Sequence, residues 1–212
     1  MRVLTLTTQK GGAGKTTLAT SLAVAAAQDG EQVIAIDLDP QGTLYAWGLR
    51  RGEREDLVVD RIESSGLAGA IRNARANGGA SLVVVDTPGI HGPALALGVA
   101  DADFALIPVK PSLFDVEATR PVVKLLRQTG KRFGFVLNQV NVSSGARNLD
   151  AAGALVAEGA APPPMIAARN DFLDAATAGL GVTEFAPKGR SAAEIRFLWQ
   201  YVKTQLPPKA EG

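Results

Sequence analysis

The sequence of 212 residues contains no cysteine and a single histidine, His91. The lack of cysteine excludes disulfides, thiolate metal sites, iron–sulfur clusters and a cysteine nucleophile, and one histidine cannot form a multi-histidine metal site. Aromatic residues make up only 5% of the chain, which argues against a base-stacking platform. No apolar run is long enough to span a membrane, and residues 1–6 lack the apolar core of a signal peptide. We therefore expect a soluble, cytoplasmic protein.

The charge is nearly balanced, at a formal +1, but it is unevenly distributed along the chain. Residues 1–106 hold nine Lys and Arg against twelve Asp and Glu, whereas residues 107–212 hold thirteen against nine. The near-neutral total gives no gross sign of a nucleic-acid binder. The second half is nevertheless basic by four charges, and a dimer would double that excess.

Apolar runs alternate with amphipathic segments, which is typical of a mostly parallel, twisted sheet with helices on both faces. The predicted strands are 3–8, 32–37, 81–86, 104–109, 132–138 and 163–168. The predicted helices are 16–29, 115–129 with a kink or later start at Pro121, 147–159, 171–178 and 191–206. Residues 42–80 are charged and weakly periodic, so their structure is the least certain. Because the chain shows no linker or internal repeat, we expect one α/β domain over residues 1–212.

A glycine-rich segment, Lys10-Gly11-Gly12-Ala13-Gly14-Lys15-Thr16-Thr17, follows the first predicted strand and begins the first helix. In this context glycines turn backbone N–H groups toward phosphate oxygens, and the helix N-terminus adds its dipole. Lys15 would reach the β- and γ-phosphates, and the Thr16 hydroxyl would bind Mg²⁺. The strict pattern G-x-x-x-x-G-K-[ST] is not met, because Gln9 occupies its first position and an additional lysine, Lys10, precedes the glycines. We predict a P-loop NTPase fold.

Carboxylates follow two of the predicted strands. Asp37 and Asp39 end the second strand, and Asp86 ends the strand 81–86. In a parallel sheet, ligands bind outside the carboxyl ends of the strands, so these side chains should converge on the phosphate loop. We predict that Asp86 and Asp37 join Thr16 at the Mg²⁺ site, although an aspartate at a strand end is also a common turn or capping residue.

The residues after the strand 132–138 bear on the choice of base. A guanine site of the Asn-Lys-x-Asp type needs a carboxylate to accept two hydrogen bonds, whereas this chain has Asn138-Gln139-Val140-Asn141. ATP is therefore favoured over GTP.

The variant loop KGGxGKTT and the stretch Asp37-Leu38-Asp39-Pro40-Gln41 resemble the deviant Walker A motif and the switch of the ParA/MinD family. The resemblance covers nearly the whole chain and is closest to short ParA-type ATPases without an N-terminal helix-turn-helix domain. It implies that Lys10 reaches the nucleotide of a partner subunit and that Asp39 serves hydrolysis, so the expected catalytic residues are Lys10, Lys15 and Asp39. It also implies that Asn138 meets adenine, with Ile166 and Arg169 in the next loop near the base. The expected nucleotide contacts are thus Lys10, Gly11, Gly12, Ala13, Gly14, Lys15, Thr16, Thr17, Asn138, Ile166 and Arg169.

The resemblance further implies an ATP-dependent homodimer that binds nucleoid DNA non-specifically and partitions plasmid or chromosomal DNA. A ParB-like centromere-binding protein or a cargo adaptor would stimulate hydrolysis. DNA contacts of this kind are phosphate contacts, so they need exposed basic side chains. The candidates in the basic half of the chain are Arg147, Arg169, Lys188, Arg190 and Arg196.

The same loop allows two other functions. The protein could position a protein assembly instead of DNA, or it could be an ATP-dependent small-molecule ligase or kinase. Lys10 and the Asp37–Gly42 stretch count against the ligase or kinase. MinD-type members carry a membrane-binding amphipathic tail, whereas here only Pro207–Gly212 follow the last predicted helix, whose single apolar stripe we interpret as core packing. Nitrogenase-type reductases need cysteines that this chain lacks.

Three further side chains attract attention near these motifs. His91 follows the Asp86–Gly89 stretch, and we interpret it as a loop residue without a special role. Tyr45 and Trp47 follow the Asp37–Gly42 stretch, where they mark either a dimer or partner surface or a packing contact.

Overall fold

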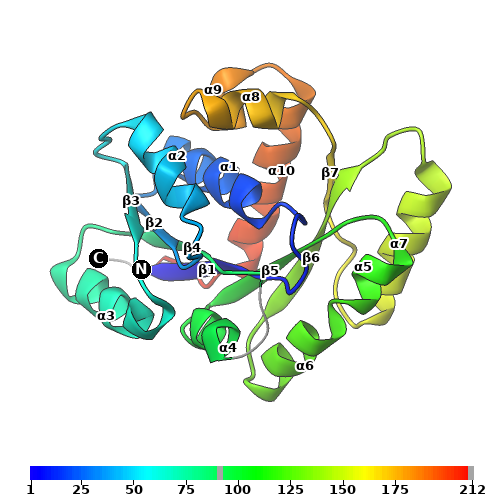
Figure 1. Ribbon diagram of the computed structural model, residues 1–212, viewed down its shortest axis with the longest axis horizontal. Coiled ribbons are helices and arrows are strands. Elements are labelled where there is room, and N and C mark those ends of the chain that lie inside the picture. The colour runs from blue at the N-terminus through cyan, green and yellow to red at the C-terminus, as the bar shows by residue number, and fades with distance from the viewer. Residues whose placement is uncertain (90–92, 210–212) are drawn as a thin grey trace.

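The computed structural model describes residues 1–89 and 93–209 as a three-layer α/β arrangement (Figure 1). Within these residues, one sheet has the strand order β3-β2-β4-β1-β5-β6-β7, and all neighbouring strands run parallel. The strands are β1 (Arg2–Leu6), β2 (Val33–Asp37), β3 (Leu57–Arg61), β4 (Leu82–Asp86), β5 (Phe104–Val109), β6 (Phe133–Val140) and β7 (Met165–Ala167). The α/β fold class with a parallel sheet is confirmed.

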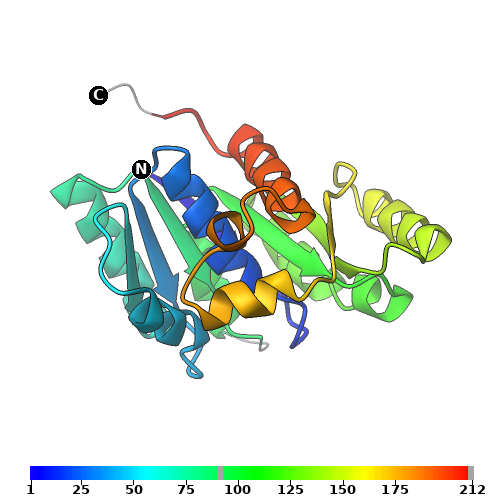
Figure 2. The ribbon, with the colours of Figure 1, turned by 90° about the horizontal axis from the view of Figure 1, so that it is seen from above.

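Helices cover both faces of this sheet. One face carries α1 (Lys15–Gln28), α2 (Thr43–Arg51), α8 (Asp171–Thr177), α9 (Val182–Phe185) and α10 (Arg190–Gln205). The other carries α3 (Leu67–Asn77), α4 (Pro93–Ala100), α5 (Leu113–Glu117), α6 (Arg120–Gln128) and α7 (Gly145–Ala157). Figure 2 shows α1 and α10 lying side by side above the central strands. None of the helices within the described ranges is long and apolar enough to cross a bilayer.

The strands are buried on both sides, which explains their continuous apolar sequences. In β1, Leu4 and Leu6 pack against the α1 and α10 side, whereas Val3 packs against α3 on the opposite side. The stripe of α10 at Ile195, Leu198, Trp199, Val202 and Leu206 is buried against α1 and the sheet, so its interpretation as core packing is confirmed.

The structure makes two parts of the expected element order more specific. The helix expected over 115–129 is divided where a kink or later start at Pro121 was predicted: α5 ends at Glu117, and α6 begins at Arg120 with Pro121 in its first turn. Proline is tolerated in a first turn, where the N–H that it lacks has no helical partner. The weakly periodic stretch 42–80 contains α2, the edge strand β3, the short 3₁₀ turn Ser64–Gly66 and α3, so Asp86 ends the fourth strand along the chain.

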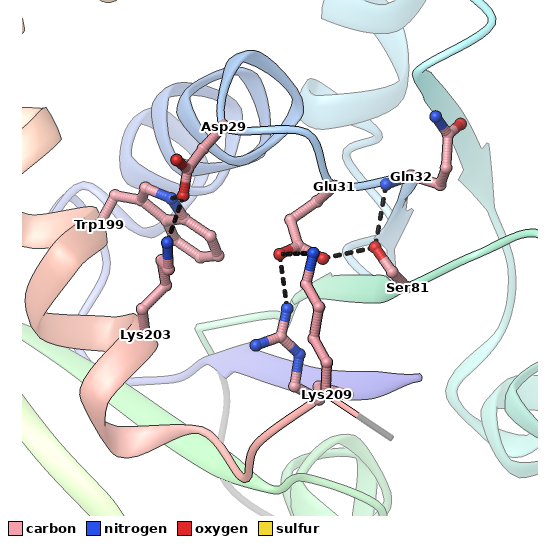
Figure 3. A network of polar contacts seen from close by, with 8 residues as sticks. Asp29, Glu31, Gln32, Ser81, Trp199, Lys203 and Lys209 are labelled. Atoms are coloured by element: carbon pink, nitrogen blue, oxygen red, sulfur yellow. Dashed lines mark hydrogen bonds and ion pairs between the residues drawn. The ribbon is translucent and has the colours of Figure 1, made fainter. Parts of the chain in front are cut away.

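At the end of the sheet where the strands begin, polar side chains form a paired network (Figure 3). The buried Glu31 carboxylate lies 2.6 Å from the Arg2 guanidinium and 2.8 Å from the Lys209 ammonium, and it accepts a hydrogen bond from Ser81. Burial alone would raise the pKa of Glu31, but the hydrogen bonds from Lys209, Ser81 and Arg2 together hold it below its ordinary value. This network fastens the segment after α10 to the starts of β1 and β4.

A second carboxylate of the network lies nearer the surface. Asp29 accepts hydrogen bonds of 2.7 Å from both the Trp199 indole and the Lys203 ammonium, which join the end of α1 to α10 (Figure 3). The hydrogen bond from Lys203 is the main cause that lowers the pKa of Asp29.

Candidate nucleotide site

The glycine-rich loop connects β1 to α1 at the carboxyl end of the sheet. Gly12 and Gly14 have φ angles of +71° and +91°, in the left-handed region that glycine adopts without strain. A Cβ atom on Gly14 would collide with the Asn138 amide, so this position needs glycine for space as well. A cleft of about 530 Å³ lies over the loop. It is lined by Gly11, Gly12, Gly14, Lys15, Thr16, Thr17, Asp39, Pro40, Gln41, Thr43, Pro88 and Gly89.

Lys15 begins α1 and is buried at the floor of this cleft. Burial lowers the pKa of its ammonium, and the charges of Asp86 and Asp39 oppose that shift. Within the described part of the chain, no carboxylate lies close enough to form an ion pair with it. The loop therefore presents a desolvated cation that an anionic ligand in the cleft could neutralise.

Thr16 and Asp86 meet across the gap between α1 and β4. The Thr16 hydroxyl donates a 2.6 Å hydrogen bond to Asp86 Oδ2, whereas the buried Asp86 Oδ1 has no hydrogen-bond partner. Burial raises the pKa of Asp86 to about 7; Asp37 and Asp39 add to this shift, while Thr16 and Lys15 oppose it. A hydroxyl beside an unpartnered carboxylate oxygen fits Mg²⁺, which prefers oxygen ligands and shares them with phosphates. Within residues 1–89 and 93–209, no cluster of three His, Asp or Glu side chains could hold a metal alone.

Asp37 lies opposite Asp86 in the sheet register, as the strand-end argument predicts. Its two oxygens already accept backbone hydrogen bonds, from Asp39 N at 2.9 Å and from Tyr45 N at 3.0 Å. The carboxylate therefore ties the turn after β2 to the first residues of α2. Asp39 lies at the edge of the cleft, where its Oδ1 accepts a 2.9 Å hydrogen bond from Gln41 N.

The three residues expected near the base, Asn138, Ile166 and Arg169, have different surroundings. Asn138, at the end of β6, donates a 2.8 Å hydrogen bond to the carbonyl oxygen of Ala13, so its amide already braces the phosphate loop. Ile166 pairs with Asn138 in the sheet, but its side chain is buried in the core. Arg169 forms a 2.6 Å ion pair with Glu194 of α10.

Three side chains that the motifs did not indicate also contact this end of the sheet. Gln139 adopts a φ of +57° at an irregularity between β6 and β7, and its amide donates a 3.1 Å hydrogen bond to Gly12 O. The Lys110 ammonium, just after β5, lies beside Gly12. Arg61, at the end of β3, donates a 2.6 Å hydrogen bond to Pro40 O. Each lies at or just after the carboxyl end of a strand, so the strand-end rule would have indicated Lys110 and Gln139, whereas Arg61 required the unpredicted β3.

The expected DNA contacts do not form one patch. Lys188, Arg190 and Arg196 lie near the start of α10, and Arg196 donates a 2.8 Å hydrogen bond to Pro187 O. Arg147 is exposed on α7, which covers the opposite face of the sheet in Figure 1.

The two aromatic residues after the Asp37–Gly42 stretch differ in burial. Trp47 is buried and donates a 3.2 Å hydrogen bond to Leu180 O, so its role is packing, whereas Tyr45 remains half-buried at the start of α2. His91 lies outside the described residues.

A parallel sheet with a glycine-rich loop at its carboxyl end, followed by a buried lysine and a threonine–aspartate pair, defines a P-loop nucleotide-binding protein. Residues 4–179 match the family described as CobQ/CobB/MinD/ParA nucleotide binding domain. The chain belongs to this family of ParA/MinD-type proteins.

Individual relatives include both partition and positioning proteins. The chain is 33% identical over 208 residues to the maintenance of carboxysome distribution protein A of Gloeobacter kilaueensis, which covers 97% of this chain and 94% of that protein. It is 29% identical over 155 residues to the chromosome-partitioning ATPase Soj of Thermus thermophilus, covering 60% of this chain and 62% of Soj. Among solved structures, the septum site-determining protein MinD of Pyrococcus horikoshii, complexed with Mg-ADP, superimposes with a TM-score of 0.79 at 18% identity over 95% of each chain. This last similarity concerns the fold.

Proposed function

We propose that the protein is an ATP-dependent, dimerising ATPase that partitions plasmid or chromosomal DNA and binds nucleoid DNA non-specifically in its ATP-bound form. The observation that carries this proposal is the pair of lysines in the phosphate loop. Lys15 is buried in the cleft, whereas Lys10 is exposed and is not among the residues that line it. A second lysine directed away from its own cleft is suited to contact the nucleotide of another subunit.

Within one subunit, the residues divide the work of phosphoryl transfer by position. Lys15 binds the β- and γ-phosphates, and Thr16 and Asp86 hold Mg²⁺, which neutralises phosphate charge when it is bound. Asp37 holds the turn that presents Asp39 to the cleft, where Asp39 orients the attacking water. Asn138 and Gln139 brace the loop from β6, beside the expected adenine site. Catalysis of this kind depends on positioning and electrostatics, so we expect slow turnover in the absence of a stimulating partner.

The Lys10 contact completes the proposed cycle. Two subunits close face to face with ATP bound, and Lys10 of each stabilises charge on the phosphates of the other. The closed dimer doubles the basic surface available to DNA phosphates. A ParB-like protein or a cargo adaptor then promotes hydrolysis, and the dimer separates.

DNA binding provides the test. We expect the purified protein to bind a non-specific duplex with Mg²⁺ and a non-hydrolysable ATP analogue but not with ADP, and to lose affinity steeply as salt rises. The Lys15→Ala variant should lose ATP-dependent dimerisation, hydrolysis and DNA binding together. Filter binding across a salt series, with sedimentation of the same samples, measures both properties. Binding that is independent of ATP or insensitive to salt would refute the DNA proposal, and a fully active Lys15→Ala variant would refute the site.

The DNA surface itself can be located by charge removal. A triple Lys188→Ala, Arg190→Ala and Arg196→Ala variant tests the α10 end, and Arg147→Ala tests α7. Each variant should retain ATP-dependent dimerisation, so a loss of DNA affinity in one of them identifies the face.

A second candidate function is the ATP-driven positioning of a protein assembly. It is favoured by the relative from Gloeobacter kilaueensis, which spans nearly the whole chain and is named for carboxysome distribution. The adjacent genes distinguish the two, since a small centromere-binding protein indicates DNA segregation. A ligase or kinase would instead transfer phosphate to a small acceptor, so steady release of inorganic phosphate from ATP alone counts against it.

A further inference from the structure

Lys10 is held by a carboxylate of its own subunit. Its Nζ lies 2.8 Å from Asp115 Oδ1, and the two side chains are 45% and 10% exposed. Asp115 also accepts a hydrogen bond from the Ser112 hydroxyl, which in turn caps the first turn of α5 by accepting a 3.1 Å bond from Asp115 N. The carboxylate is therefore fixed at the start of a helix, whereas the lysine is the partner that can move.

The pair links two neighbouring strand ends of the site. Lys10 follows β1 and Asp115 follows β5, which is hydrogen-bonded to β1 in the sheet. The two lysines of the loop consequently take different directions, with Lys15 on the floor of the cleft and Lys10 turned sideways onto α5. Leu113 and Phe114 beside Asp115 are 63% and 80% exposed, and a subunit that closed over Lys10 would cover this surface.

We propose that Asp115 is a positioning residue that holds Lys10 against its own subunit until a second copy of this chain brings its nucleotide phosphates within reach. This inference rests on the proposed function, which gives Lys10 its role across the dimer. The phosphates and Asp115 are anions that compete for one ammonium, so the ion pair opposes closure by the free energy needed to break it. A pair with an exposed lysine is weak, so its removal should tighten the dimer only about three- to tenfold.

The test is a double-mutant cycle on the intact protein with Mg²⁺ and a non-hydrolysable ATP analogue. The dimer dissociation constant is measured by analytical ultracentrifugation for wild type, Asp115→Asn, Lys10→Ala and the double variant. Asparagine can still accept the hydrogen bond from Ser112, so α5 keeps its first turn. We expect Asp115→Asn to tighten the dimer, Lys10→Ala to weaken it, and Asp115→Asn to have no effect in the Lys10→Ala background.

Glu117→Gln is the matched control, because Glu117 is exposed on the same helix and its substitution removes the same charge without touching Lys10. Glu117→Gln should leave the dimer dissociation constant unchanged. Asp115→Asn should leave the affinity for ADP unchanged. If Asp115→Asn leaves the dimer unchanged or weaker, or acts equally without Lys10, the positioning role is refuted. If Lys10→Ala dimerises like wild type, the role of Lys10 across the dimer is refuted, and the role of Asp115 with it.

Discussion

At the end of the sheet where the strands begin, Glu31 is buried among Arg2, Ser81 and Lys209; at the end where they finish, Asp86 is buried beside Thr16 with one oxygen unpartnered. Both residues are carboxylates removed from water, yet the pKa of Glu31 is lowered and that of Asp86 is raised to about 7. Paired cations stabilise the charge of Glu31, whereas burial and, after it, neighbouring carboxylates disfavour the charge of Asp86.

We interpret the difference as that between a structural cluster and the proposed binding cluster. Both oxygens of the Glu31 carboxylate have partners within the chain, so their pairing contributes to folding. The buried Asp86 carboxylate destabilises the ligand-free protein, and a bound cation would remove this unfavourable free energy. Functional sites commonly give up stability for affinity in this way. Substitutions at the two ends should therefore have opposite effects.

The largest effect is expected for Asp86→Asn. We expect affinity for ATP with Mg²⁺ to fall about 10- to 100-fold, because the proposed Mg²⁺ site loses the charge of one carboxylate. The ligand-free variant should nevertheless melt several degrees higher than wild type at pH 8, since a buried charge is removed. Isothermal titration calorimetry with Mg²⁺-ATP and thermal melts without nucleotide measure the two changes. A variant that binds normally, or that is less stable than wild type without ligand, would show that Asp86 is a structural residue.

The second largest effect is expected for Glu31→Gln, which likewise replaces a carboxylate by an amide, but at the opposite end of the sheet. It leaves the buried Arg2 guanidinium without its counter-ion, so we expect a loss of about 2 kcal/mol of stability. For a domain of this size, that corresponds to a melting temperature lower by roughly 5 °C. Affinity for ATP with Mg²⁺ should not change. A shift in affinity comparable to that of Asp86→Asn would mean that the two ends are coupled.

How much of this contrast was visible in the sequence depends on the range of the interactions. The loop Lys10–Thr17 and the carboxylates Asp37 and Asp86 were predicted, because motif spacing and strand ends are local features. Glu31, by contrast, is a buried network residue whose partners come from residues 2, 81 and 209, and no local pattern connects them.

The missed elements and contacts have the same cause. In β3 only Leu57 is buried, so this edge strand lacks the apolar run that revealed the central strands. Lys110 and Gln139 reach the phosphate loop only because β5 and β6 end beside it. The ion pair between Arg169 and Glu194 of α10 joins residues that no sequence motif connects. The sequence therefore predicted which candidate site residues gather at this end of the sheet, whereas the contacts that restrain those residues required the folded sheet.

A pH series on the two variants sharpens the comparison further. The pKa of Glu31 is lowered from 4.5, so its stabilisation is present above that pH and is lost in acid. The gap between wild type and Glu31→Gln should therefore be constant from pH 6 to 8 and shrink below about pH 4.5. Asp86 has a pKa raised from 3.8 to about 7, so its protonated form stabilises the fold in acid, and this contribution is lost progressively as pH rises from 3.8 to about 7. The advantage of Asp86→Asn should accordingly be absent only below pH 3.8, grow as pH rises to about 7 and stay constant above that; parallel pH profiles of the two variants in ligand-free thermal melts would contradict the assignment.

The smallest effect is expected for Asp29→Asn, which tests whether pairing or burial determines how much each carboxylate contributes to thermal stability. Asp29, like Glu31, has more than one partner, namely Lys203 and Trp199. The side chains of Asp29 and Lys203 are, however, 34% and 36% exposed. Water and salt screen such a pair, so we expect a fall in melting temperature of only about 1 °C that disappears in 0.5 M salt. The Glu31→Gln difference should persist in the same salt, because its carboxylate is buried. If both variants lost their effect in salt, burial would not distinguish the two carboxylates, and the low pKa of Glu31 would reflect surface attraction instead of a structural network.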